Sequence, residues 1–220
     1  RDSYYINLSL YIIITNTLIK ICLKNLILVF IVLFSNLIFS QEKNTKKLES
    51  PIDFPILLSG NFGELRSSGF HSGIDIKTKG KEGVDIRAID SGYISRVQVS
   101  TSGFGKVVYI DHGNNLTTVY AHLSRFSEKI EKIINELQYK MKKYEVRKFF
   151  RPNELKIGKK EIIGLSGNTG SSFGPHLHFE IRKTNEELPI NPLLYNFDVL
   201  DTIRPYLKNL FLYGIKNGLL

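Results

Sequence analysis

The sequence predicts a mainly β protein: an antiparallel β-sheet domain with one inserted amphipathic helix, preceded by a hydrophobic helix. Short apolar and β-branched runs that alternate with Gly-containing turns indicate the strands. One stretch with helical periodicity indicates the inserted helix, and a separate apolar stretch opens the chain. With 220 residues, 42% hydrophobic and 23% charged, the chain can form one domain plus appendages. This composition excludes a disordered acidic tail and a disulfide-stapled miniprotein.

Residues 1–40 differ in composition from the rest of the chain, because they contain no Gly, Ala or Pro. The apolar run Leu26–Phe39 is short for a membrane span and suits the hydrophobic region of a signal peptide, with Lys24 before it and Ser40 after it. We expect a signal peptide over about 23–40, translation from a non-standard start codon, and mis-assigned upstream sequence before it. The alternative is an uncleaved anchor helix. Either way, we expect a secreted, periplasmic or cell-envelope protein whose only membrane contact is this segment.

The remaining chain divides into three parts. Residues 41–50 are polar without an apolar period, which predicts a linker. Residues 51–199 form the predicted folded domain, and residues 200–220 the start of a truncated C-terminal β region. Within the domain the predicted strands carry the sequences VDIRAI, YISRVQV, KVVYI, LTTVYAHL, EIIGLSG and LHFEIRK.

One segment of the domain has a helical pattern instead. From Glu128 to Phe150, apolar residues recur at helical spacing from Ile130 to Tyr144, and Ser127 is placed to cap the helix. We expect this apolar stripe to be buried and the lysines to stay in water. The insertion 128–153 then either forms one wall of the substrate groove, as a partial lid, or is a solvent-side scaffold.

The histidines point to a metal site. Cys22 is the only cysteine, so such a site must be built from His and carboxylate. His176 and His178 occupy alternate positions of a predicted strand and therefore face the same side. His71 and Asp75 lie four apart where a Gly-containing turn enters a strand. Two imidazoles and one carboxylate match a catalytic zinc that keeps a fourth position for water.

Each of these pieces also has a purely structural interpretation. A His pair on a strand can be a hydrogen-bonded surface pair, and a His-x3-Asp spacing arises often by chance. Together they favour the metal site. His122 is a third histidine near a predicted strand end, whereas for His112, before a turn, we prefer a structural role.

At the level of motifs, the domain resembles the lysostaphin-like (LytM-type) zinc metallopeptidases, which act on peptidoglycan. The resemblance covers about 51–199 and rests on His-x3-Asp, Tyr-Ala-His-Leu, Gly-Asn-Thr-Gly-x-Ser and Gly-Pro-His-Leu-His-Phe-Glu, which occur in the family's order. The helical insertion departs from typical members and looks like a variant found in cell-envelope proteins of the Bacteroidetes.

The resemblance implies a β domain with a groove and a site of five residues. His71, Asp75 and His178 match the metal ligands, and His122 and His176 match the two catalytic histidines. We assign His176 to the general base and His122 to the oxyanion side, although the two roles can be exchanged. The absence of a His-Glu-x-x-His helix excludes the thermolysin arrangement.

The leading hypothesis is a zinc endopeptidase that hydrolyses peptide crosslinks of bacterial peptidoglycan. A formal charge of +9 suits an anionic cell wall, although charge alone does not select a partner. One alternative is a family member without catalysis that binds peptidoglycan or activates an amidase; such members usually lose a ligand, and none is lost here. A nucleic-acid-binding module built on the basic run from Lys140 to Arg151 is disfavoured, because such a run more often marks the solvated face of a helix.

Overall fold

The computed structural model describes residues 20, 23–26, 48–66 and 69–201. The chain divides into two units, 1–44 and 45–220, and the described residues of the first unit are helical. Among all described residues, no helix combines the length and the apolar character needed to cross a membrane. Most of the predicted signal or anchor segment, most of the linker and most of the predicted C-terminal β region lie outside the described residues.

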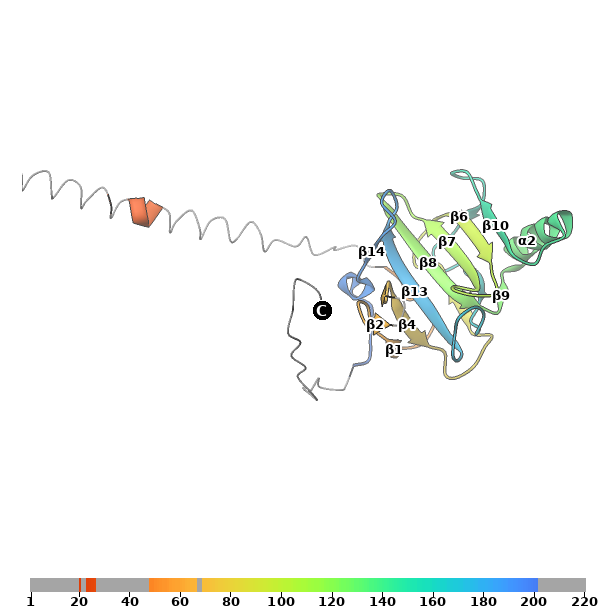
Figure 1. The fold of residues 1–220 in the computed structure, drawn as a ribbon, viewed down its shortest axis with the longest axis horizontal. Coiled ribbons are helices and arrows are strands. Elements are labelled where there is room, and N and C mark those ends of the chain that lie inside the picture. Colours follow the sequence, from red (N-terminus) through yellow and green to blue (C-terminus); the bar gives the residue numbers. More distant parts are fainter. Residues whose placement is uncertain (1–19, 21–22, 27–47, 67–68, 202–220) are drawn as a thin grey trace, which may run out of the picture. The chain divides into compact units, whose positions relative to one another are not determined.

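A nine-stranded antiparallel sheet forms the framework of the described part of the second unit (Figure 1). β14 (Leu188–Ile190) extends it beside β13, and β11 (Lys156–Ile157) pairs with β6. The main path runs in the order β1 (Leu58–Gly60), β4 (Ile74–Lys77), β13 (His176–Lys183), β8 (Leu116–Leu123), β7 (Lys106–Asp111), β6 (Gly92–Val99) and β10 (Val146–Phe149). The mainly β, antiparallel prediction is confirmed.

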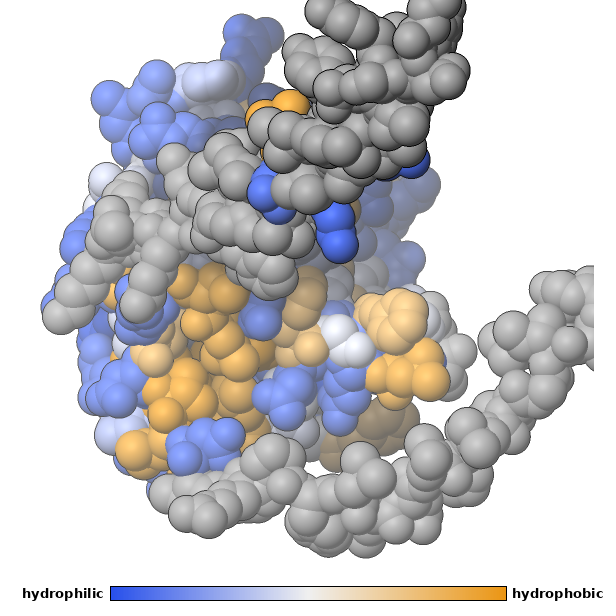
Figure 2. All heavy atoms as spheres, turned by 90° about the vertical axis from the view of Figure 1, so that its left-hand side faces the viewer, coloured by the Kyte–Doolittle hydropathy of each residue, from blue (hydrophilic) through white to orange (hydrophobic). Residues whose placement is uncertain are grey.

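Two smaller sheets and a short helix complete the domain. β5 (Asp85–Arg87), β12 (Ile162–Leu165) and β9 (Arg125–Phe126) form a second antiparallel sheet. β2 (Leu65–Arg66) and β3 (Gly69–Phe70) form a short hairpin, and a 3-10 helix, η1 (Pro192–Tyr195), follows β14. The face that carries β14, β2 and β1 shows apolar side chains gathered between hydrophilic ones (Figure 2).

Side-chain alternation gives the main sheet two different faces. On β13, Leu177, Phe179 and Ile181 are fully buried in the main apolar core, and Tyr120 of β8 packs with them. The residues between them face the opposite side, where a small apolar cluster of β7 and β8 lies. This cluster consists of Val107, Tyr109, Val119 and Ala121, with Phe104 packed against it. His178 and Glu180 therefore belong to the second face, away from the main core.

The inserted helix, α2 (Glu128–Met141), is shorter than its pattern predicts. Ser127 stands at the N-cap position, but its hydroxyl makes no capping hydrogen bond. Lys142 adopts a left-handed conformation that ends the helix, and the chain then forms β10 beside β6. The predicted extension to Phe150 is therefore wrong, because residues 146–149 pair with the edge of β6 and Val146 and Phe150 are buried in the main core.

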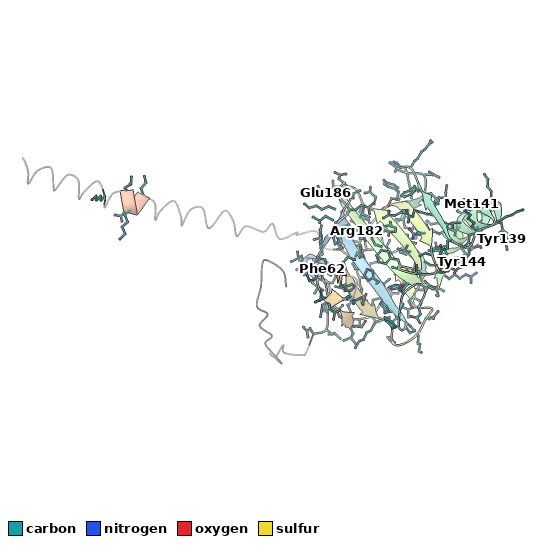
Figure 3. The ribbon with its side chains drawn as sticks, viewed as in Figure 1. Phe62, Tyr139, Met141, Tyr144, Arg182 and Glu186 are labelled. Atoms are coloured by element: carbon teal, nitrogen blue, oxygen red, sulfur yellow. The ribbon has the colours of Figure 1, made fainter. Side chains whose placement is uncertain are left out.

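Burial of the apolar stripe is also only partly as predicted. Ile130 and Ile134 are buried, and the helix contacts β9 and β10. Met141 and Tyr144, at the other end of the stripe, are 48% and 58% exposed. They lie with Tyr139 at the outer end of the insertion (Figure 3). The stripe stays packed against the core as far as Leu137 and leaves the domain only in its last turn, where α2 points away from the sheet (Figure 1).

Candidate metal centre and its groove

The three predicted metal ligands meet at one end of the sheet's second face. Asp75 of β4 is paired in register with His178 of β13, and His71 lies on the loop that leads into β4. Asp75 Oδ1 lies 2.9 Å from His178 Nδ1 and 3.1 Å from His71 Nε2. The two imidazole nitrogens lie 2.9 Å apart, and all three side chains are buried.

Hydrogen bonds on the outer side of each ring fix which nitrogen faces the centre. His71 Nδ1 lies 2.7 Å from the carbonyl oxygen of Asn61, which can only accept, so Nδ1 carries the proton. His178 Nε2 donates in the same way to Glu180 Oε1 at 2.8 Å. His71 Nε2 and His178 Nδ1 therefore present lone pairs beside the Asp75 carboxylate. This buried set of two nitrogens and one anionic oxygen fits a divalent cation.

Asp75 is held as a carboxylate. Burial by itself would raise its pKa, but close polar contacts with His176, His178 and His71 and the hydrogen bond from Arg66 hold the pKa far below its ordinary value. Arg66 Nη2 donates to Asp75 Oδ2 at 2.6 Å, so one oxygen is bound by an arginine while the other faces the imidazoles. Asp75 thus keeps one oxygen for a metal.

Glu180 is a buried site residue to which the sequence analysis gave no role. It is fully buried and accepts hydrogen bonds from His178, from Ser72 Oγ at 2.5 Å and from Arg182 Nε at 2.5 Å. Burial would raise its pKa, but the bonds from His178 and Arg182 prevail and lower it to about 2. The signal was present in the sequence, because Glu180 stands two residues after His178 and so faces the same side of the strand.

The two predicted catalytic histidines lie beside this centre. The ring centres of His122 and His176 are 4.8 Å apart, and His176 Nε2 lies 3.5 Å from Asp75 Oδ1. His122 Nδ1 donates to the carbonyl of Thr169 at 2.8 Å, and His176 Nδ1 donates to that of Gly174 at 2.8 Å. Each ring therefore leaves Nε2 unbonded by these contacts. The fold brings all five predicted site residues together.

His122 is held in an unusual backbone conformation. It is the next-to-last residue of β8 and has φ of 59°, in the left-handed region that non-glycine residues rarely adopt, at a cost of about 1–3 kcal/mol. Its backbone N–H donates to the carbonyl of Phe104 at 2.9 Å, and its ring bonds Thr169. Burial is the main cause that lowers the pKa of His122, to about 4, so the ring is neutral near pH 7.

Glycines permit the close approach of the His71 loop to β13. A Cβ on Gly73 would lie 2.3 Å from the carbonyl oxygen of Phe179. Gly69 has φ of +130°, a value that a residue with a side chain rarely adopts. The loop can therefore lie directly on the strand that carries His178.

An open groove of about 1300 Å³ runs past Asp75, His122 and His176. Its walls come from the segment before β1, the end of β4 and the loop Ser171–Pro175. No residue of the insertion 128–153 lines it, and β10 stands at the opposite end of the strand order from β4. The insertion therefore forms no wall of this groove, contrary to that hypothesis, and the scaffold role stays a prediction.

His112 lies at the other end of β7 and β8 from this site, next to Asp111 and its partner Thr117. Its ring nitrogens lie 2.9 Å from the carbonyl of Ser91 and 2.7 Å from Thr118 Oγ1. These contacts join neighbouring strands and turns. The preferred structural role of His112 agrees with them.

Comparison with known proteins identifies the family. The profile of peptidase family M23 matches residues 69–139 and 137–192, which include all five site residues. The chain belongs to this family. The resemblance to lysostaphin-like, LytM-type peptidases is thereby confirmed.

Curated relatives match part of the chain at moderate identity. The DD-carboxypeptidase/endopeptidase Mpg of Neisseria meningitidis is 33% identical over 129 residues, 59% of this chain and 23% of that protein. The murein hydrolase activator NlpD of Salmonella dublin is 31% identical over 135 residues, 61% of this chain and 28% of its own length. The chain thus spans less than a third of these curated relatives.

A solved structure shares the fold. A zinc-containing peptidase from Vibrio cholerae superimposes with a TM-score of 0.50 at 20% identity, over 70% of this chain and 41% of that one. At this identity the likeness concerns the fold alone.

Proposed function

We propose that this M23 domain is a zinc-dependent endopeptidase that hydrolyses peptide crosslinks of bacterial peptidoglycan. The observation that carries the proposal is the buried His71, Asp75 and His178 cluster, with two further histidines at the adjoining groove. The Mpg relative, whose name describes a carboxypeptidase and endopeptidase, supports the same reading. Because peptidoglycan lies in the cell envelope, the proposal includes an envelope or secreted location.

In this proposal His71 Nε2, His178 Nδ1 and Asp75 Oδ1 hold the zinc. Zinc in such a site supplies a Lewis acid that polarises a carbonyl and lowers the pKa of water from 15.7 to about 7. Arg66 and Glu180 keep the protein ligands oriented from outside, since each bonds a ligand atom that does not face the centre. An extended peptide would lie in the groove that runs past Asp75, His122 and His176.

His122 and His176 form the proton-handling pair of the proposed mechanism. Both rings use Nδ1–H to bind a backbone carbonyl, which fixes their orientation and leaves Nε2 for the reaction. A neutral ring accepts the proton of the attacking water at Nε2, and a protonated ring donates from the same atom to an oxyanion or leaving amine. The assignment of His176 as base and His122 to the oxyanion side stays a prediction.

A second candidate function is peptidoglycan binding or hydrolase activation without catalysis. The observation in its favour is the relative named murein hydrolase activator, which matches 61% of the chain. Against it stands the full set of five site residues in this chain, since loss of a ligand is the usual mark of a non-catalytic member.

Digestion of purified peptidoglycan, with the products analysed by mass spectrometry, tests the proposal. We expect new peptide ends to appear, to disappear with a metal chelator and to return when zinc is added back. Crosslinks left intact by the zinc-loaded chain, together with binding to the same peptidoglycan, would overturn catalysis in favour of the second candidate.

A further inference from the structure

Two lysines stand on the groove wall in line with the metal-ligand candidate Asp75. From Asp75 to Lys79 the chain alternates, with Ile76 and Thr78 fully buried on one side and Lys77 and Lys79 exposed on the other. Asp75 and Lys77 therefore share one face of β4, and Lys79, in the turn that follows β4, lines the same groove. The sequence analysis gave these lysines no role.

Local structure fixes where the two ammonium groups lie. Lys77 ends β4 and is paired in register with His176 of β13. The turn after it is held by Thr78 Oγ1, which donates to the carbonyl of Lys81 at 2.8 Å. Lys79 Nζ lies 4.2 Å from the centre of the Phe54 ring, a cation–π contact that holds the charge at the groove wall.

These charges are available to a ligand. Within the described residues, neither Lys77 nor Lys79 forms an ion pair. By contrast, Lys159 and Lys160, on another surface, both pair with Glu49. The one acidic residue among the described groove-lining residues is Asp75, and its outer oxygen is already bound by Arg66. The groove wall therefore has an excess of positive charge.

We propose that Lys77 and Lys79 form a carboxylate-binding subsite, so that the groove selects peptides with a free carboxylate near the bond beside Asp75. This inference rests on the proposed peptidase function and names its substrate class. Alternate residues of a strand are about 7 Å apart, and an extended peptide advances about 3.3 Å per residue. Lys77 thus reaches a substrate carboxylate about two residues from the reacting bond. Lys79, in the turn after β4, reaches a carboxylate further from that bond along the peptide.

Binding of two synthetic stem tetrapeptides to the zinc-loaded 220-residue chain tests the subsite. One peptide carries free carboxylates, and in the other every carboxylate is a carboxamide; neither contains a crosslink. Calorimetry should give about tenfold tighter binding for the free-acid peptide at low salt, with the ratio falling as salt rises. In the double variant Lys77→Gln, Lys79→Gln the ratio should fall to less than about twofold.

The matched control is the double variant Lys159→Gln, Lys160→Gln, which removes the same charge outside the groove and should keep the tenfold ratio. Equal binding of both peptides to the unsubstituted chain overturns the subsite, as does an unchanged ratio in the Lys77, Lys79 variant. A fall of equal size in the control variant also overturns it, since general charge would then explain the preference.

The outcome is separable from that of the proposed function. If the chain prefers the free-acid peptide but cleaves no peptidoglycan, the subsite proposal is supported and the peptidase proposal is contradicted. If the chain cleaves peptidoglycan but binds both tetrapeptides equally, the peptidase proposal is supported and the subsite proposal is contradicted.

Discussion

The two ends of the main strand order are built on different principles. At the β4–β13–β8 end, buried polar groups converge: three candidate ligands, the fully buried Glu180, and His122 in a left-handed conformation. At the β6–β10 end, α2 adds apolar packing through Ile130 and Ile134 and then extends into solvent. Buried charge is costly, so its concentration at one end marks the reactive site, while the insertion adds apolar packing to the other.

The largest expected effect separates catalysis from metal binding within the first region. His122→Ala and His176→Ala should each retain zinc and lose hydrolysis by about two to four orders of magnitude, because each removes a proton-transfer group without removing a ligand. Metal content and turnover are measured on the same preparations. Normal turnover by either variant would remove that residue from the mechanism.

A smaller effect is expected at Glu180, which bonds the candidate ligand His178 but is not a ligand itself. Glu180→Gln should weaken zinc binding by about 10- to 100-fold, because the carboxylate that orients His178 is replaced by an amide. Competition with a chelator of known affinity gives the zinc dissociation constant. Glu187→Gln is the matched control, since Glu187 bonds Arg182 at 3.3 Å but contacts no candidate ligand. Equal zinc affinity in Glu180→Gln and in the unsubstituted chain would contradict the positioning role.

A substitution in the insertion should change the free energy of unfolding but not zinc binding. Ile134→Ala removes a buried side chain between α2 and the domain and should lower the free energy of unfolding by about 2–5 kcal/mol. Zinc content should stay unchanged, because no insertion residue lines the groove. Denaturant unfolding measures the free energy of unfolding, and elemental analysis measures the zinc content. Loss of zinc from the folded variant would show that the two regions are coupled.

The smallest effect is expected at the outer end of the same helix. Tyr139 is 84% exposed, so Tyr139→Ala should change the free energy of unfolding by no more than about 0.5 kcal/mol. The comparison with Ile134→Ala, made under identical conditions, measures how far packing extends along α2. A loss as large as that of Ile134→Ala would mean that the outer turns are packed against part of the chain.

The sequence predicts the site better than the insertion, for a physical reason. His176 and His178 share a strand face by a period of two, and Gly69 and Gly73 signal a tight loop, so local rules bring these residues to one place. The end of α2 depends on a distant partner instead. Whether 146–149 continues a helix or joins the sheet is decided by the free edge of β6, which local periodicity does not contain.

Two features of the site also needed the structure. The hydrogen bond from Arg66 to Asp75 joins a hairpin to β4, and no spacing in the sequence predicts it. The left-handed conformation of His122 arises from contacts with Phe104 and Thr169, which come from separate turns. Such long-range contacts are set by the assembled sheet.

Zinc content per chain tests the central claim most directly. The unsubstituted chain should bind about one zinc, and His71→Ala and Asp75→Ala should each lose most of it, because each removes one of three ligands. His112→Gln, a substitution of a histidine outside the cluster, should retain about one zinc. Full zinc retention by both His71→Ala and Asp75→Ala would contradict the assignment of the metal centre and the proposed function built on it.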